Sequence, residues 1–118
     1  MLAILGGTFD PIHLGHIKMA EIALEELNAS KIVILPSGDP PHKLATTSAC
    51  HRYNMAKLAC RNNKKLIVSR LEIDRRGLSY TLDTLLEIKK QKPKEQVALI
   101  VGSDSLHSFP SWHEPEKI

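Results

Sequence analysis

Two glycines and two histidines near the N-terminus are the residues best suited to chemistry in this sequence. Gly6 and Gly7 end a short apolar run, and glycines at such a turn let the backbone come close to a phosphate. His13 and His16 follow at helical spacing, so both imidazoles project from one face of a helix that starts there. Because helix-start N–H groups also attract anions, this segment predicts a phosphate-binding site.

The same residues are open to other interpretations. Neither of the phosphate-binding patterns GxxxxGKS/T and GxGxxG occurs in the sequence. Two histidines at this spacing can bind zinc, although no cysteine or carboxylate lies beside them at ligand spacing. In the simplest alternative, His13 caps the helix and His16 packs against the protein.

Short apolar runs alternate with helical segments along the chain. Four runs rich in Leu, Ile and Val predict buried strands at residues 2–5, 31–35, 66–69 and 97–101. Helical spacing predicts one helix over residues 14–27, a second after Ser48 with Met55, Leu58 and Ala59 inward, and a third from residues 79–81. This order is typical of an α/β protein with a Rossmann-like parallel sheet flanked by helices, here as one domain over residues 1–118.

Residues capable of chemistry follow three of the four predicted strands. The segment 6–16 follows the first strand, His42 and Lys43 follow the second, and the segment 102–112 follows the fourth. In such sheets ligands bind outside the carboxyl ends of the strands, where the strand order reverses. We therefore expect one shared site. The turn at residues 74–77 is expected to be solvent-exposed and without a chemical role.

Composition narrows the classes of partner. The chain has 118 residues, a net charge of +3 and only 4% aromatic residues, so its basic residues have few stacking platforms for single-stranded nucleic acid. No apolar run approaches membrane-spanning length, and the N-terminus lacks a signal-peptide pattern. Cys50 and Cys60 form neither a CxxC motif nor a disulfide framework. These features predict a cytoplasmic protein without nucleic-acid or membrane partners.

The motifs named above, together with later segments of the chain, resemble those of a known family. The segment Gly-Gly-Thr-Phe-Asp-Pro-Ile-His-Leu-Gly-His at residues 6–16 resembles the HxGH signature of the nucleotidyltransferase superfamily. Its form is most similar to that of bacterial nicotinate-nucleotide adenylyltransferases. Further matches follow the family order over nearly the whole chain, at Pro40–Lys43, Arg52 with Met55, Ser79–Thr81, Gly102–Asp104, and Trp112 with Glu114 and Pro115.

The resemblance implies transfer of AMP from ATP to nicotinate mononucleotide, which gives deamido-NAD and pyrophosphate. It implies catalytic roles for His13, His16 and Lys43, which would hold the triphosphate. ATP would contact Gly6, Gly7, Thr8, Phe9, Gly102 and Asp104. Mg²⁺ would bridge the phosphates, held by substrate oxygens and water and not by a cage of protein ligands.

The second substrate brings a cationic pyridine ring and a carboxylate. The resemblance places it on Tyr80, Thr81 and Trp112. An exposed indole can stack on the ring, and helix-start N–H groups suit a carboxylate. The alternatives are a hydrophobic lid for Trp112 and ordinary helix capping for Tyr80 and Thr81. For Arg52, spacing alone favours a solvated surface position, whereas the resemblance favours a structural or phosphate-binding role.

One departure from the family pattern limits what the resemblance implies. Family members are usually longer and carry an Ile-Ser-Ser/Thr-Thr-x-Ile/Val-Arg motif that grips ATP, whereas this sequence ends at Ile118. We therefore expect an uncovered sheet edge beside the fourth strand and low activity of this chain alone. Another HxGH nucleotidyltransferase, or an inactive or partial nucleotide-binding fragment, stays an alternative. The oligomeric state is also open, with a homo-oligomer as one outcome.

Overall fold

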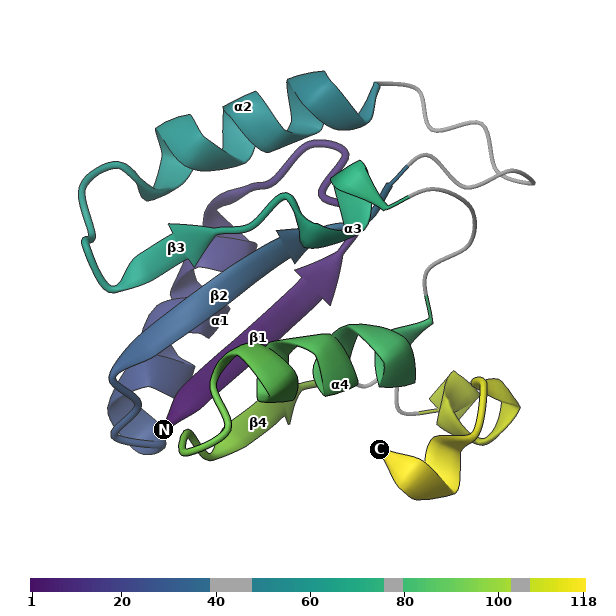
Figure 1. Cartoon of the computed structure of the whole chain (residues 1–118). Helices are drawn as coiled ribbons and strands as arrows, with labels where there is room; N and C mark the ends of the chain where they lie inside the picture. Colours follow the sequence, from purple (N-terminus) through teal and green to yellow (C-terminus); the bar gives the residue numbers. More distant parts are fainter. Residues whose placement is uncertain (39–47, 76–79, 103–106) are drawn as a thin grey trace.

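A computed structural model describes residues 1–38, 48–75, 80–102 and 107–118 (Figure 1). Its centre is a four-stranded parallel sheet with the strand order β3-β2-β1-β4. The strands are β1 (Leu2–Gly7), β2 (Lys31–Pro36), β3 (Leu66–Val68) and β4 (Val97–Ile100). The predicted α/β class with a parallel sheet is confirmed, and no strand end differs from the prediction by more than two residues.

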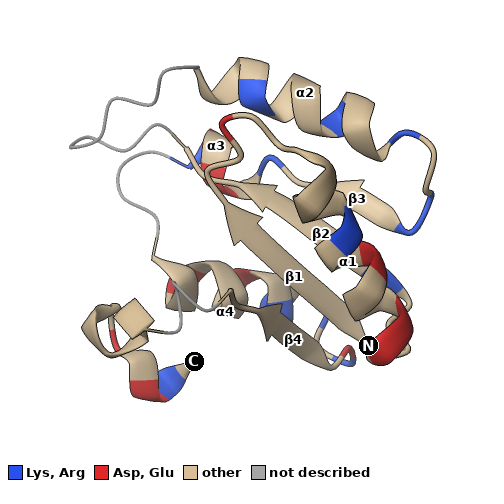
Figure 2. Ribbon diagram, turned by 180° about the vertical axis from the view of Figure 1, so that it is seen from behind, with Lys and Arg blue, Asp and Glu red and all other residues tan. Residues whose placement is uncertain are grey.

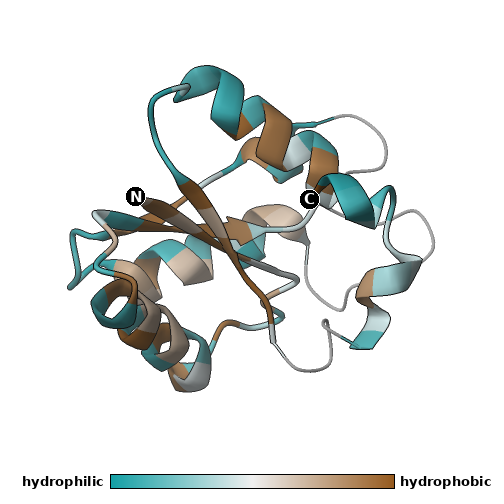
Figure 3. Ribbon diagram, turned by 90° about the horizontal axis from the view of Figure 1, so that it is seen from below, coloured by the Kyte–Doolittle hydropathy of each residue, from teal (hydrophilic) through white to brown (hydrophobic). Residues whose placement is uncertain are grey.

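Helices cover both faces of the sheet. They are α1 (Leu14–Glu26), α2 (Ala49–Cys60), α3 (Leu71–Asp74) and α4 (Thr81–Gln91), and the 3-10 turns η1 (Phe109–Ser111) and η2 (Pro115–Lys117) follow β4. Successive strand residues point to opposite faces, so Ala3 and Leu5 pack toward α1 and α2 while Leu2 and Ile4 pack toward α4. Because both faces are covered, the strands are nearly continuous apolar runs, which Figure 3 shows in brown between the helices.

The face that α2 turns toward the sheet differs from the predicted one. Leu58 is 60% exposed and Ala59 is also exposed. The buried positions recur every three or four residues, as one face of a helix does, and are Ala49, Arg52, Ala56 and Cys60. The prediction was wrong for Leu58 and Ala59, while Met55 is half-buried. It failed because a charged residue, Arg52, occupies the core-facing stripe where hydropathy indicates an apolar residue.

The strand order reverses around the central strand β1. From β1 the chain moves outward to β2 and β3, and then returns through α3 and α4 to β4 on the other side of β1. The connections before and after this reversal run over opposite faces of the sheet. The carboxyl ends of β1 and β4 therefore open onto a crevice, which is where ligands bind in sheets of this kind.

Charged side chains lie on the outer elements of the molecule. Figure 2 shows Lys and Arg distributed over several helices and loops, with Asp and Glu among them on α1 and α4. This distribution resembles an ordinary solvated surface more than a basic groove. No helix within the described ranges is long and apolar enough to cross a bilayer.

Candidate active site

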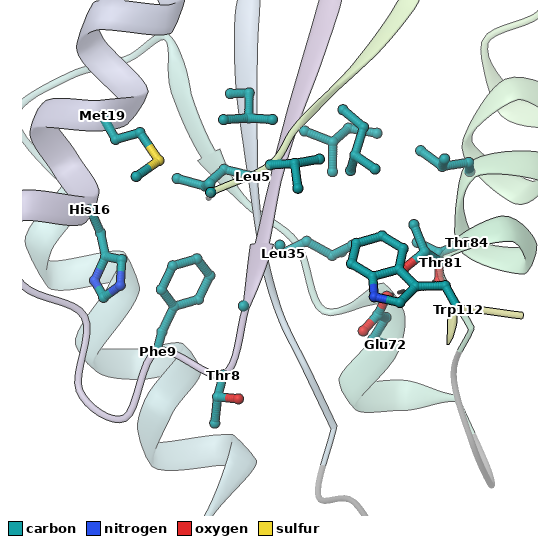
Figure 4. A pocket seen from close by; sticks show the side chains of 18 residues that line it. Leu5, Thr8, Phe9, His16, Met19, Leu35, Glu72, Thr81, Thr84 and Trp112 are labelled. Atoms are coloured by element: carbon teal, nitrogen blue, oxygen red, sulfur yellow. Dashed lines mark hydrogen bonds between the residues drawn. The ribbon is translucent and has the colours of Figure 1, made fainter. Parts of the chain in front are cut away.

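A cavity of about 390 Å³ lies at the carboxyl ends of β1 and β4. Figure 4 shows two facing walls. One wall comes from the turn after β1 and from α1, with Thr8, Phe9, His16 and Met19. The other comes from α3, α4 and the segment after β4, with Glu72, Thr81, Thr84 and Trp112. The cavity thus occupies the crevice that the strand-order reversal creates.

Most of the predicted site residues come together at this cavity. Those that line it are Gly6, Gly7, Thr8, Phe9, His16, Thr81, Gly102 and Trp112. His13 and Tyr80 are next to lining residues but are not part of the wall. Lys43 and Asp104 lie outside the described residues. The roles of all these residues toward a ligand stay predictions.

His13 and His16 form a pair of capping hydrogen bonds at the N-terminus of α1. His13 is the N-cap, and its Nδ1 accepts a hydrogen bond from the Gly15 N–H at 3.1 Å. In return, the His13 backbone N–H donates to Nδ1 of His16, also at 3.1 Å. Because each Nδ1 accepts, the proton of each neutral imidazole lies on Nε2. The rings stack with centroids 3.8 Å apart, so the pair presents Nε2–H donors from a rigid unit.

The pKa of His16 lies below its ordinary value, first because the ring is partly buried and second because His13 is close. His16 is therefore neutral at physiological pH and still donates through Nε2–H. The capping alternative describes what His13 does with Nδ1, while no hydrogen bond to its Nε2 occurs among the described residues. No group of three metal-ligating side chains occurs in the described part of the chain.

The turn after β1 is shaped by Phe9. Phe9 has a positive φ of 50°, which is uncommon for a bulky residue and typical of functional turns. Its buried ring meets the His16 ring edge-on at 4.9 Å and lies against Gly7, where an added Cβ would be 3.3 Å from the phenyl carbon Cζ. Phe9 thus packs against His16, and a side chain at position 7 would press on its ring.

Arg52 also holds the turn that follows β1 in place, through hydrogen bonds to backbone carbonyls. It is fully buried, and its guanidinium donates to the carbonyls of Thr8 at 2.7 Å, Ser37 at 3.0 Å and Gly38 at 3.5 Å. The surface position favoured by spacing alone was therefore wrong. Arg52 ties the residues that follow β1 to those that follow β2, which is a structural role.

The opposite wall contains the N-terminus of α4. Tyr80 is the N-cap, and no side chain of the described residues hydrogen-bonds to the first-turn N–H groups. The Tyr80 ring stacks on His113 with centroids 4.4 Å apart. The indole of Trp112 is oriented by a hydrogen bond from Nε1 to Ser108 Oγ at 3.2 Å. An anion-attracting helix end and an aromatic face therefore occur together.

A model of the cytidylyltransferase-like family matches residues 4–118. The chain belongs to this family. A probable nicotinate-nucleotide adenylyltransferase from Thermomicrobium roseum is 42% identical to it over 119 residues, with 99% of this chain and 56% of that protein covered. Another from Desulfitobacterium hafniense strain DSM 10664 / DCB-2 is 41% identical, with 99% and 58% covered. The chain thus spans a little more than half the length of these relatives.

A solved structure supports the same relationship for this cytidylyltransferase-like chain. The Plasmodium falciparum nicotinic acid mononucleotide adenylyltransferase complexed with NaAD aligns with a TM-score of 0.84 at 28% identity, covering 98% of this chain and 58% of that one. The predicted nucleotidyltransferase fold and the resemblance to nicotinate-nucleotide adenylyltransferases are confirmed by these comparisons.

The cytidylyltransferase-like site also includes residues that the sequence interpretation missed. A Cβ added at Gly15 would lie 2.9 Å from Cε1 of His13, so a side chain at position 15 would displace the His13 imidazole. Glu72 lines the cavity from α3, and Arg75 reaches α4 by donating to Thr84 at 2.9 Å and Glu87 at 2.9 Å. The expected solvent exposure was therefore wrong for Arg75, which is half-buried, whereas the expected lack of a chemical role stays a prediction. The HxGH motif itself signals Gly15, whereas nothing local signals Glu72.

Proposed function

We propose that this chain carries the nucleotide site of a nicotinate-nucleotide adenylyltransferase, which transfers AMP from ATP to nicotinate mononucleotide. The observation that supports this most is the pairing of two walls across one cavity. A neutral imidazole N–H donor, His16, stands on one wall. The N-terminus of α4, which no described side chain caps, and the Trp112 indole stand on the other. Phosphates suit the first wall, and a ring bearing a carboxylate suits the second.

In the reaction, a phosphate oxygen of the mononucleotide attacks the α-phosphorus of ATP. A new P–O bond forms, the bond to the β-phosphate oxygen breaks, and pyrophosphate leaves. Positioning and charge stabilisation supply most of the catalysis in such transfers. The Nε2–H groups of His13 and His16 would donate to phosphate oxygens as their charge rises, from a pair already fixed by hydrogen bonds. Lys43 would add a positive charge.

ATP would enter as its Mg²⁺ complex. Among the lining residues that the structure describes, Glu72 is the one carboxylate, and no group of three metal ligands occurs in the described part of the chain. This donor set does not form a protein cage for Mg²⁺. The ion would therefore be held by phosphate oxygens and water, as Mg²⁺ often is beside phosphates.

The second substrate would lie along the far wall. Backbone N–H groups at the start of α4, near Thr81, would bind its carboxylate, and Trp112 would stack on its cationic ring. Gly6, Gly7, Thr8, Phe9, Gly102 and Asp104 would contact ATP. We further propose that the reaction takes place in the cytoplasm. A homo-oligomer is one outcome that a measurement of the oligomeric state would test.

A pyrophosphate-release assay tests the function. The chain is incubated with ATP, Mg²⁺ and one of three acceptors: nicotinate mononucleotide, nicotinamide mononucleotide or phosphopantetheine. Release with nicotinate mononucleotide, accompanied by deamido-NAD, is the expected result. Release with phosphopantetheine alone would assign another HxGH nucleotidyltransferase. Binding of both nucleotides without release would assign a partial nucleotide-binding unit.

A further inference from the structure

The cavity wall that faces His16 contains a carboxylate, Glu72, to which the proposed reaction assigns no role. Glu72 lies on α3, after the carboxyl end of β3, and its side chain is half-buried at the cavity wall. Its Oε2 accepts a hydrogen bond from Thr84 Oγ1 at 2.9 Å. Its Oε1 has no hydrogen-bond partner within residues 1–38, 48–75, 80–102 and 107–118. Among the described residues, Oε1 can therefore accept a hydrogen bond from a ligand without losing a partner.

The position of this carboxylate is fixed from several sides. The α3 backbone packs directly on Gly38 after β2, where an added Cβ would lie 2.8 Å from the Glu72 carbonyl oxygen. Arg75 donates to Thr84 Oγ1 at 2.9 Å and to Glu87 Oε2 at 2.9 Å. Because Thr84 Oγ1 accepts from Arg75, its own proton is directed to Glu72. Glu72 is therefore a pre-positioned acceptor.

A carboxylate at this position favours contact with some groups of a nucleotide and disfavours contact with others. It repels the phosphates and the ring carboxylate, which the His16 wall and the α4 N-terminus already suit. It attracts hydroxyl donors and positive charge. In a pyridine mononucleotide these two features are adjacent, since the ribose is attached to the cationic ring nitrogen and lies between the ring and the phosphate.

We propose that Glu72 is a substrate-binding residue that accepts a hydrogen bond from a ribose hydroxyl of the pyridine mononucleotide and faces the positive charge of its ring. This inference rests on the proposed function. It assigns a contact to the carboxyl end of β3, so that β1, β3 and β4 all contribute to one site. Glu72 recognises the part that nicotinate and nicotinamide mononucleotides share.

The test is a binding titration that does not depend on turnover. Trp112 is the only tryptophan in the sequence and lines the cavity, so its fluorescence reports ligand binding. Glu72→Gln keeps an oxygen for the Thr84 hydrogen bond and removes the charge. We expect about tenfold weaker binding of both mononucleotides, the lower end of the range for charged hydrogen bonds, and ATP binding within about twofold of wild type.

Control variants separate binding from folding. Glu87→Gln alters the far end of the same hydrogen-bond network and should change no dissociation constant by more than about twofold. Thr84→Val removes the hydroxyl that orients Glu72 and should weaken both mononucleotides about threefold, whereas Thr84→Ser should restore wild-type binding.

Several results would overturn the proposal. Unchanged mononucleotide binding by Glu72→Gln, or equal weakening of mononucleotides and ATP with a lower melting temperature, would give Glu72 a structural role alone. Weakening of the nicotinate form only would mean that Glu72 contacts the ring carboxylate. These results overturn the inference about Glu72 and leave the proposed function intact. If the wild-type chain binds neither mononucleotide, the proposed function fails together with the inference.

Discussion

The backbone N–H of His13 donates to Nδ1 of His16 at 3.1 Å, and this single hydrogen bond decides which nitrogen of His16 carries the proton. With Nδ1 occupied, Nε2–H of His16 is the donor available to the cavity. Burial, and then the nearby His13, lower the pKa of His16, so the donor carries no positive charge at neutral pH. The motif residue thus acts as an oriented dipole.

Replacing His16 with alanine should slow adenylyl transfer about 100-fold or more, because one pre-positioned donor to a developing oxyanion contributes on that scale. Binding of nicotinate mononucleotide should stay within about threefold. Pyrophosphate release and Trp112 fluorescence measure the two quantities. Lys18→Ala, on the exposed side of α1, is the matched control. Near-normal turnover of an active form carrying His16→Ala would refute the role of His16.

The free energy of unfolding should depend on pH through His16. Its folded-state pKa lies below the ordinary value of 6.5, so the unfolded chain binds the proton more readily. The stabilising contribution of neutral His16 is therefore complete above that value and is lost as the pH falls through and below it. Urea unfolding from pH 7.5 to 5 should show a steeper loss of stability for wild type than for His16→Gln. Equal slopes would contradict this.

Gly15→Ala should separate activity from stability. The new Cβ would lie 2.9 Å from Cε1 and 3.0 Å from Nδ1 of His13, so the imidazole must rotate out of its cap. Loss of the cap costs about 1 kcal/mol, but alanine in a helix gains back roughly 0.5–1 kcal/mol over glycine. Thermal unfolding should change little, while adenylyl transfer falls about tenfold. A variant with full activity would show that His13 orientation is unimportant.

Arg52→Met should destabilise the fold by about 3 kcal/mol, because carbonyls of Thr8, Ser37 and Gly38 lose their buried donor. Arg61→Met, at an exposed arginine just after α2, should stay within about 0.5 kcal/mol of wild type. Chemical denaturation gives both values. Similar effects of the two variants would mean that the Arg52 hydrogen bonds add little to stability.

Trp112→Ala should weaken nicotinate and nicotinamide mononucleotides by similar factors, roughly threefold to thirtyfold, since stacking depends on the cationic ring they share. The preference for the nicotinate form should persist, because it arises at the N-terminus of α4. Titration calorimetry measures both affinities without the indole. Loss of the preference in Trp112→Ala would place base recognition on the tryptophan instead.

The fold could be predicted from the sequence where local pattern and tertiary environment agree. Strands buried on both faces are continuous apolar runs, and residues 2–5 and 31–35 show this clearly. Prediction failed for the inward face of α2. Arg52 can be buried there because backbone carbonyls of two other segments accept hydrogen bonds from its guanidinium. It also missed α3, which is too short for any helical period to appear.

The site residues were likewise predictable where local sequence pattern determined their position, and not where tertiary contacts did. Residues 6–9, His16, Gly102 and Trp112 were expected to meet because the carboxyl ends of parallel strands share one edge, and the structure brings them to one cavity. Glu72 and Arg75 were missed because their place depends on hydrogen bonds between α3 and α4, through Thr84. No single segment of sequence contains that information.

The pairing of β1 with β4 joins the most distant parts of the sheet, with Leu2 beside Val97, whereas β1 meets β2 with Leu2 beside Lys31. Closing the longer loop costs more chain entropy, so β4 is expected to dock after β1, β2 and β3 have assembled. Because β4 and the segment behind it supply one wall of the cavity, nucleotide binding becomes available only at the last step of folding. A nucleotide added during refolding should therefore stabilise the completed four-stranded sheet relative to the unfolded chain.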